Sequence, residues 1–463
     1  LVPGRQITAD RVTVRADKTG LSISGPGKIG KVPFDATYRQ GFAPDQHGKS
    51  SVEGSVTLSQ AAAEEFGLGL PTGMVSGQGR GQVLMSLVRG EPGELTLTSD
   101  LQGIGLTIPE IGWTKPAGSR GKLSVSVRMS KPPRVKDLSL SAAGLSVQGT
   151  VDMRASGGLD VARFDKVTLD DWLNASLAIR GQGQGVALEV TGGSVDLRRM
   201  PDARSRKVSR RASTPMKITL DRLQISAGIA LTGFHGTISQ TGGANGDFSA
   251  GVNGQGAVRG TIAPSPNGTA VRLQSHDAGT VLAASGLFAS ARGGGMDLTL
   301  VPQAGTGIYD GKVRITAVRV RNANVLAELL NAISVVGILE QLNGEGLVFN
   351  NAEADFLLTP KALQIKRGSA IGASLGVSMA GVYQSASDQL TMHGVVSAIY
   401  LLNGIGAILT RRGEGLFGFN YELRGKASDP QVSVNPLSIL TPGMFREIFR
   451  APAPVLKGQG TGG

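Results

Sequence analysis

Short segments in which apolar and polar residues alternate recur along most of the chain. In one of them, Leu123, Val125 and Val127 alternate with serines. Because successive side chains of a β-strand point to opposite faces, such a segment predicts a strand with one apolar and one polar face. Turn signals such as Gly157–Gly158 and Asp310–Gly311 separate the segments. Short links of this kind predict neighbouring strands that run antiparallel, as a meander.

Helical periodicity is confined to a few short stretches. We expect helices over residues 58–66, 281–288 and 325–342, with Asn324 as the N-cap of the third, and a last helix near 442–450. These helices cannot cover the roughly thirty strands that a chain of this length can form. The predicted fold is therefore all-β dominated. It is an elongated, highly curved antiparallel β-sheet groove, a trough folded about its own apolar face.

The apolar positions of the clearest segments are the candidates for lining this groove. They are Leu123, Val125, Val127, Leu138, Leu140, Val147, Val186, Leu188, Val190, Ile218, Leu220, Ile229, Leu231, Val313, Ile315, Phe356, Leu358, Leu363, Ile365, Leu375, Val377 and Met379. Plain core packing is the alternative role for these side chains. A slip of one residue in the register of a strand would move its whole apolar set to the other face.

Composition narrows the class of protein. Glycine contributes 68 residues, aromatic residues are 4 % and apolar residues 40 %, so small aliphatic side chains must form the buried surface. The chain has no cysteine, which excludes disulfides, thiolate nucleophiles and cysteine metal sites. The longest apolar stretch, Ile399–Leu409, is too short to span a bilayer as a helix. No leader follows Leu1, so we expect a fragment or processed form whose membrane anchor lies upstream.

About half of the net charge of +12 comes from one polar segment, near 198–214. Its central cations are candidates for contact with anionic lipid headgroups: Arg204, Arg206, Lys207, Arg210 and Arg211. A solvated loop is the alternative interpretation. Nucleic acid is not predicted as a partner, because no aromatic residues interleave with these cations to stack bases.

The sequence contains one motif typical of hydrolases, but the surrounding segments do not have the structure that this motif requires. Gly372–Gly376 has the GxSxG spacing around Ser374, and Asp388 and His393 follow in the order of a hydrolase triad. That motif requires a strand, a sharp turn and a helix, whereas strand alternation continues through Val377. The four histidines are scattered, without the spacing of metal ligands. We expect no enzymatic activity, no cofactor and no metal.

The predicted last helix carries three large apolar residues on one side, Phe445, Ile448 and Phe449. They either pack onto the end of the groove or dock into a membrane interface. Residues 451–463 are rich in glycine and proline and predict a flexible tail.

Residues 277–449 resemble the AsmA-like family of envelope proteins, and within it the YhdP branch. The segments that carry the resemblance are His276–Gly279, Ala291–Gly295, Gly311–Val313, Leu329–Leu330, Leu342–Phe349, Tyr400–Gly404, Gly413–Gly418, Asp429–Ser438 and Leu440–Arg446. Residues 1–270 share with the family only the general pattern of repeated strands separated by glycines. The resemblance thus suggests a repetitive groove segment over 1–270 and an AsmA-like segment over 271–450.

The resemblance implies a bridge-like lipid transfer protein of the periplasm, anchored in the inner membrane by an upstream helix. The expected partners are phospholipids and the inner and outer membranes, with envelope proteins as further candidates. The function predicted is a non-enzymatic conduit that carries acyl chains along the groove. The alternatives are a periplasmic scaffold for outer-membrane proteins, binding strands by edge pairing, and a β-solenoid adhesin, which the lack of a fixed repeat length disfavours.

Overall fold

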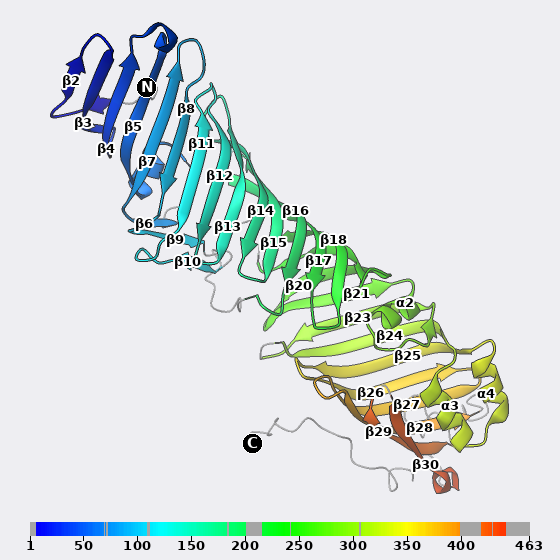
Figure 1. The fold of residues 1–463 in the computed structure, drawn as a ribbon. Helices are drawn as coiled ribbons and strands as arrows, with labels where there is room; N and C mark the ends of the chain where they lie inside the picture. The colour runs from blue at the N-terminus through cyan, green and yellow to red at the C-terminus, as the bar shows by residue number, and fades with distance from the viewer. Residues whose placement is uncertain are drawn as a thin grey trace. The chain divides into compact units, whose positions relative to one another are not determined.

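The computed structural model describes residues 6–68, 70, 73–108, 112–182, 185–200, 215–240, 242–304, 307–398, 418–427 and 429–440. Over these residues the chain forms thirty β-strands and four α-helices (Figure 1). It divides into two compact units, Leu1–Ser226 and Ala227–Gly463. The prediction of an all-β fold with an open, mostly antiparallel sheet is confirmed.

The first unit is built on one open sheet. Its strands, in the order in which they pair, are β1 (Ile7–Thr8) and β2 (Thr13–Ala16), both beside β3 (Gly20–Ile29), then β4 (Val32–Gly41), β5 (Lys49–Leu58), β7 (Gly79–Val88), β8 (Glu94–Ser99), β11 (Lys122–Arg128), β12 (Arg134–Ala142), β13 (Leu145–Met153), β14 (Leu159–Leu169), β15 (Leu173–Gln182), β16 (Gly185–Asp196) and β17 (Met216–Gln224). A small second sheet contains β6 (Val75–Gly77), β9 (Ile104–Ile108) and β10 (Trp113–Lys115).

One pairing in this unit departs from the predicted meander. β16 and β17 are parallel, with Glu189 opposite Lys217 and Val195 opposite Leu223. Parallel neighbours need a connection that returns along the strand, usually a dozen residues or more. Residues 197–215 lie between the two strands and provide that length, so the expectation of an antiparallel pair was wrong here.

The second unit is an antiparallel meander throughout its described strands. In pairing order these are β18 (Ala230–Ser239), β19 (Asn245–Val252), β20 (Gly256–Ser265), β21 (Gly268–Ser275), β23 (Gly295–Pro302), β24 (Tyr309–Val320), β25 (Leu347–Leu358), β26 (Ala362–Gly372), β27 (Leu375–Gln384), β28 (Gln389–Ala398), β29 (Phe419–Lys426) and β30 (Asp429–Asn435). The short β22 (Ala291–Arg292) also pairs with β24.

The described helices lie close to the positions predicted for them, with two corrections. α1 (Gln60–Glu65) and α2 (Ala278–Ala284) fall near the two short predicted helices and are shifted or shortened at their ends. The predicted single helix over 325–342 is two helices, α3 (Asn324–Ala332) and α4 (Val336–Asn343).

The two helices are separate because Ser334, between them, has a left-handed backbone (φ 57°) that no α-helix accommodates. The N-cap of α3 is Ala323, without a side-chain hydrogen bond, so the assignment of Asn324 as the cap was wrong. The C-cap of α4 is Gly344. The predicted helix near 442–450 and the tail lie outside the described residues.

The division between Ser226 and Ala227 differs from the boundary near 270 that the resemblance suggested. Residue 270 lies inside β21, which pairs on both sides with strands of the second unit.

Charged cross-strand pairs line the polar face of the second unit. Arg272 Nε donates to Asp297 Oδ1 at 2.9 Å, and Gln274 Nε2 donates to Asp297 Oδ2 at 3.1 Å. The hydrogen bond from Arg272, more than the one from Gln274, holds the pKa of Asp297 below its ordinary value. Arg314 pairs with Glu353 on the same face.

A carboxyl whose pKa is lowered by folding adds stability that is present above its unfolded value, about 3.9, and is lost as the pH falls through the lowered folded value. We therefore expect Asp297→Asn to flatten the acid limb of the stability curve, measured by urea unfolding between neutral pH and about pH 3. The effect should be small and weaken with salt, because Arg272 is 54 % exposed. An unchanged acid limb would contradict this role.

Candidate functional site

The register of the first unit gathers apolar side chains into rows that cross the strands on one face of the sheet, here called the apolar face. One row runs Ile23, Tyr38, Val52, Met85, Leu95, Val127, Val135, Val151, Ala162, Ile179 and Leu188. The adjacent row runs Gly25, Ala36, Gly54, Val83, Leu97, Val125, Leu138, Gly149, Phe164, Leu177, Val190 and Ile218. Most of their large side chains are only half-buried, so this face is not a sealed core.

The second unit repeats the arrangement. One row runs Phe248, Gly260, Leu273, Leu298, Val313, Ala354, Gly368, Met379, Gly394, Tyr421 and Val434. The adjacent row runs Gly246, Ile262, Val271, Leu300, Gly311, Phe356, Ile365, Gly381, Met392, Leu423 and Val432. The opposite face of these strands carries Arg272, Lys312 and Asp355.

Most groove candidates from the sequence lie on the apolar faces. In the first unit these are Leu123, Val125, Val127, Leu138, Leu140, Val147, Val186, Leu188, Val190 and Ile218. In the second unit they are Leu231, Val313, Ile315, Phe356, Leu358, Leu363, Ile365, Leu375, Val377 and Met379. Within this set, Leu231 and Leu375 are buried in closed core.

Two candidates fit less well. Leu220 on β17 is buried, at 4 % exposure, in a stretch where the pairing with β16 is irregular. Ile229 precedes β18 and belongs to no strand. The headgroup candidates from Arg204 to Arg211, and Phe445, Ile448 and Phe449, lie outside the described residues.

The small sheet β6–β9–β10 covers one margin of the apolar face of the first unit. Its Trp113 packs with Leu101 and Ile104 against Leu145 and Leu169 of the main sheet. Trp113 Nε1 donates to the carbonyl oxygen of Ala143, in the β12–β13 turn, at 2.9 Å. The small sheet thus covers one side of the apolar face. The large side chains of the two rows described above stay mostly half-buried.

A buried lysine at the end of β10 stabilises the small sheet. Lys115 is fully buried, and its ammonium group lies among four backbone carbonyl oxygens, those of Leu101, Ile104, Pro116 and Ser119, at 2.6–3.1 Å. Burial lowers the pKa of Lys115, and the charge of Asp100 opposes that shift. Nothing in the local sequence signals this lysine, because its acceptors are backbone atoms.

Helices α3 and α4 fill the apolar face of the second unit near its last strands (Figure 1). Leu329 and Leu330 of α3 and Leu342 of α4 pack in one cluster with Val396 of β28 and Leu423 of β29. Since α4 contacts β25 while α3 contacts β30, the intervening sheet must curve around the helix pair. The helix pair therefore covers the apolar face over β27–β30 and over one end of β24 and β25, where Val318 and Phe349 join the same cluster. Towards the other end of these strands, Val313 and Phe356 are half-buried.

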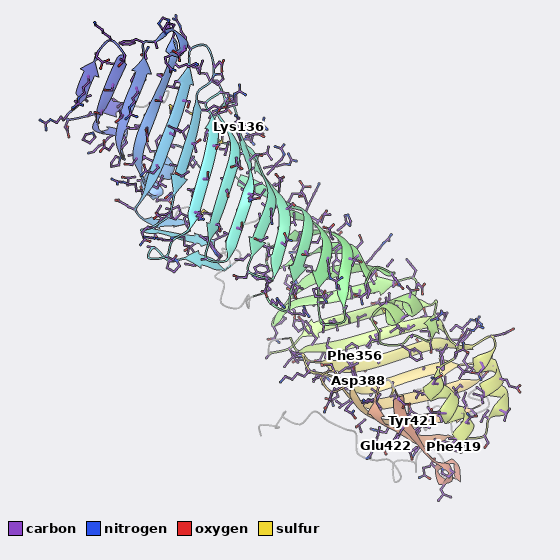
Figure 2. All side chains as sticks on the ribbon, in the orientation of Figure 1. Lys136, Phe356, Asp388, Phe419, Tyr421 and Glu422 are labelled. Atoms are coloured by element: carbon purple, nitrogen blue, oxygen red, sulfur yellow. The ribbon has the colours of Figure 1, made fainter. Side chains whose placement is uncertain are left out.

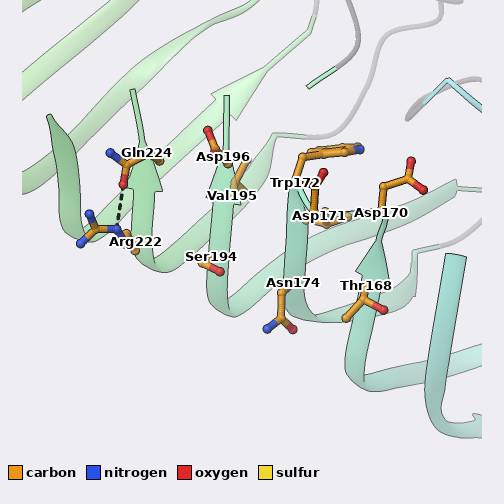
Figure 3. A pocket seen from close by; sticks show the side chains of 11 residues that line it. Thr168, Asp170, Asp171, Trp172, Asn174, Ser194, Val195, Asp196, Arg222 and Gln224 are labelled. Atoms are coloured by element: carbon orange, nitrogen blue, oxygen red, sulfur yellow. Dashed lines mark hydrogen bonds between the residues drawn. The ribbon is translucent and has the colours of Figure 1, made fainter. Parts of the chain in front are cut away.

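A shallow hollow at the ends of β14–β17 is polar instead. It is lined by Thr168, Asp170, Asp171, Trp172, Leu173, Asn174, Ser194, Val195, Asp196, Arg222 and Gln224 (Figure 3). At one end of the hollow, Arg222 Nε donates to Gln224 Oε1, two residues further along β17, at 2.9 Å. The hydrogen bond from Arg198 lowers the pKa of Asp196 to about 2. Asp196 is paired with Arg198, and Asp171 with Arg199.

The serine motif does not form a triad. Ser374 lies in the β26–β27 turn and its Oγ is 3.2 Å from Gln341 Oε1. Asp388 lies beyond the other end of β27, where Tyr383 Oη donates to it at 3.2 Å. A ten-residue strand places the two about 30 Å apart. His393, on β28, therefore cannot bridge them.

The described residues contain no group of histidines and carboxylates placed to hold a metal ion. Every helix among them is too short or too polar to cross a bilayer. Comparison of the chain with protein-family models, curated proteins and solved structures finds no match.

Proposed function

We propose that the protein is a non-enzymatic lipid conduit, in which phospholipid acyl chains lie on the apolar faces while headgroups remain in water. The observation that carries the proposal is the continuity of the apolar rows. Each crosses ten or so strands of its unit without a charged residue, and most of its large side chains are half-buried. Monomeric proteins rarely expose contiguous apolar surface of this extent without a partner.

The energetics suit transport rather than tight binding at one point. An acyl chain of about sixteen carbons gains on the order of ten kcal/mol by leaving water, at about 0.8 kcal/mol per CH₂. Because every position in a row is apolar or a glycine, apart from Tyr38 and Tyr421, no single position offers a charged group that would hold one lipid tightly. A chain can therefore move along the row without leaving a deep minimum. Transfer between the inner and outer membranes of a diderm envelope is the setting that the family resemblance suggests.

The first test is native mass spectrometry of the purified protein, with lipid extraction from the same sample. We expect several phospholipids per chain. Val127→Asp and Val313→Asp place a charge in the groove of each unit and should remove most of the bound lipid, since an unpaired carboxylate is costly to bury. Ser126→Asp and Lys312→Asp, one residue away and on the opposite face, should leave it bound.

Circular dichroism of all four variants checks that the sheet persists. A lipid-free wild-type protein, or equal loss in both sets of variants, would refute the conduit. If unfolded outer-membrane protein co-purifies in place of lipid, the scaffold function is favoured instead. The edge strand β2, whose Val14 is 62 % exposed, offers such a client a place to pair.

A further inference from the structure

Four phenylalanines on the apolar faces each lie directly opposite a glycine of the neighbouring strand. The pairs are Phe34 with Gly27, Phe164 with Gly149, Phe248 with Gly260, and Phe356 with Gly311. Two of these four pairs lie in each unit. The amino-acid sequence does not reveal these pairs, because the two partners come together only through strand register.

Each ring occupies the space that a side chain on the glycine would need. A Cβ added to any of the four glycines would lie within 3.0 Å of a ring atom, closer than real Cβ atoms come to other groups. The rings of Phe248 and Phe356 approach their glycines most closely. They therefore lie over the backbone of the adjacent strand, as in the packing of an aromatic ring on a cross-strand glycine. Phe356 is labelled in Figure 2.

This orientation affects the height of the groove floor. A phenylalanine standing upright from the sheet would project well above the neighbouring valines and leucines. Laid over a glycine, the ring instead takes up the space that a side chain at that position would fill. Phe356 continues a row with Leu300, Gly311 and Ile365, and Phe248 continues one with Gly260 and Leu273.

We propose that these glycine–phenylalanine pairs determine the clearance of the groove and so restrict it to slender, unbranched acyl chains. The inference rests on the proposed function and names the substrate class of that groove. At Gly311 or Gly260, any larger residue would lift the facing ring into the path of the lipid. Removal of the ring would deepen the floor at that point and admit bulkier hydrocarbon.

The test uses the full chain and two probes: dioleoyl phosphatidylglycerol and a phospholipid with a pyrene-labelled tail, each supplied from vesicles. Gly311→Ala should weaken retention of the dioleoyl lipid by about tenfold, the cost expected when an overpacked ring must move. Phe356→Ala should keep the dioleoyl lipid and bind more of the pyrene lipid. The double variant, with both changes, should recover binding of the dioleoyl lipid, because no ring remains to be lifted.

Gly228→Ala is the matched control, since a Cβ there meets no heavy atom within 4 Å. Equal binding by wild type and Gly311→Ala would overturn the inference. So would a loss in Gly311→Ala that Phe356→Ala does not repair, because the glycine would then act on folding alone. If the wild-type protein binds neither lipid, the proposed function fails first, and this inference with it.

Discussion

Replacement of Lys115 by methionine is expected to lower the free energy of unfolding of the first unit by about 3 kcal/mol or more. The methionine can fill the volume but cannot donate, so the carbonyl oxygens of Leu101, Ile104, Pro116 and Ser119 lose their shared partner. A buried acceptor left unpaired costs about 1–3 kcal/mol, and several are affected together. Arginine should also be costly, because its planar fork cannot point at oxygens arranged around one atom.

The measurement is urea unfolding followed by tryptophan fluorescence. Both tryptophans of the chain, Trp113 and Trp172, belong to the cluster beneath the small sheet, so their signal reports on this region. Lys122→Met is the control, since Lys122 is exposed at the start of β11. Equal shifts in the two variants would show that the ammonium group contributes no special stability.

The same lysine should leave a signature at alkaline pH. Burial lowers its pKa, so below the folded value both states are charged and the folded state carries the full cost of burying that charge. As the pH rises from the folded value towards the unfolded value, about 10.4, the cost disappears and stability rises. We expect this rise in the wild-type protein and its absence in Lys115→Met. The same profile in both proteins would argue that the carbonyls cancel the effect of burial.

The second large effect concerns the helix pair of the second unit. Leu330→Ala and Leu342→Ala should each cost about 2–5 kcal/mol, the range for removal of a fully buried leucine side chain. Val336→Ala, at a site that is 63 % exposed on α4, should change stability by less than about 0.5 kcal/mol.

Much of this loss should be local to α3 and α4. Both helices are shorter than isolated helices need to be, and neither has a side-chain N-cap, so packing on the sheet holds them. Hydrogen exchange should therefore quicken in 324–343 before it does in β24 and β25. Uniform acceleration across the second unit would mean that the helices and the sheet unfold as one.

The strand pattern explains why most of the candidates named from the sequence lie on the apolar faces. With a period of two, Val313 and Ile315 must share a face, whatever lies beside them. The same argument placed Leu123, Val125 and Val127 together. It could not show which residues face each other across strands, because register depends on turn lengths and bulges that local alternation does not encode.

The two departures from the predicted fold, the divided helix and the parallel strand pair, also depend on features that local alternation does not encode. The division of the 325–342 helix depends on one left-handed residue, Ser334, within an otherwise periodic stretch. The parallel pairing of β17 depends on where a long connection takes the chain. Neither is visible in hydrophobic periodicity, which reports burial on one face and not the path between elements.

By itself, the sequence determined that this is an all-β protein with one-sided strands, few helices and no cysteine chemistry, because composition and side-chain alternation act residue by residue. Only the tertiary structure decided that the apolar sides join into continuous rows. It also decided that the small sheet, stabilised by Lys115, covers one side of the apolar face of the first unit. It also decided that α3 and α4 close the last strands and that phenylalanines lie over glycines. Each of these depends on contacts between residues far apart in the chain, and such contacts are fixed by register and curvature rather than by local pattern.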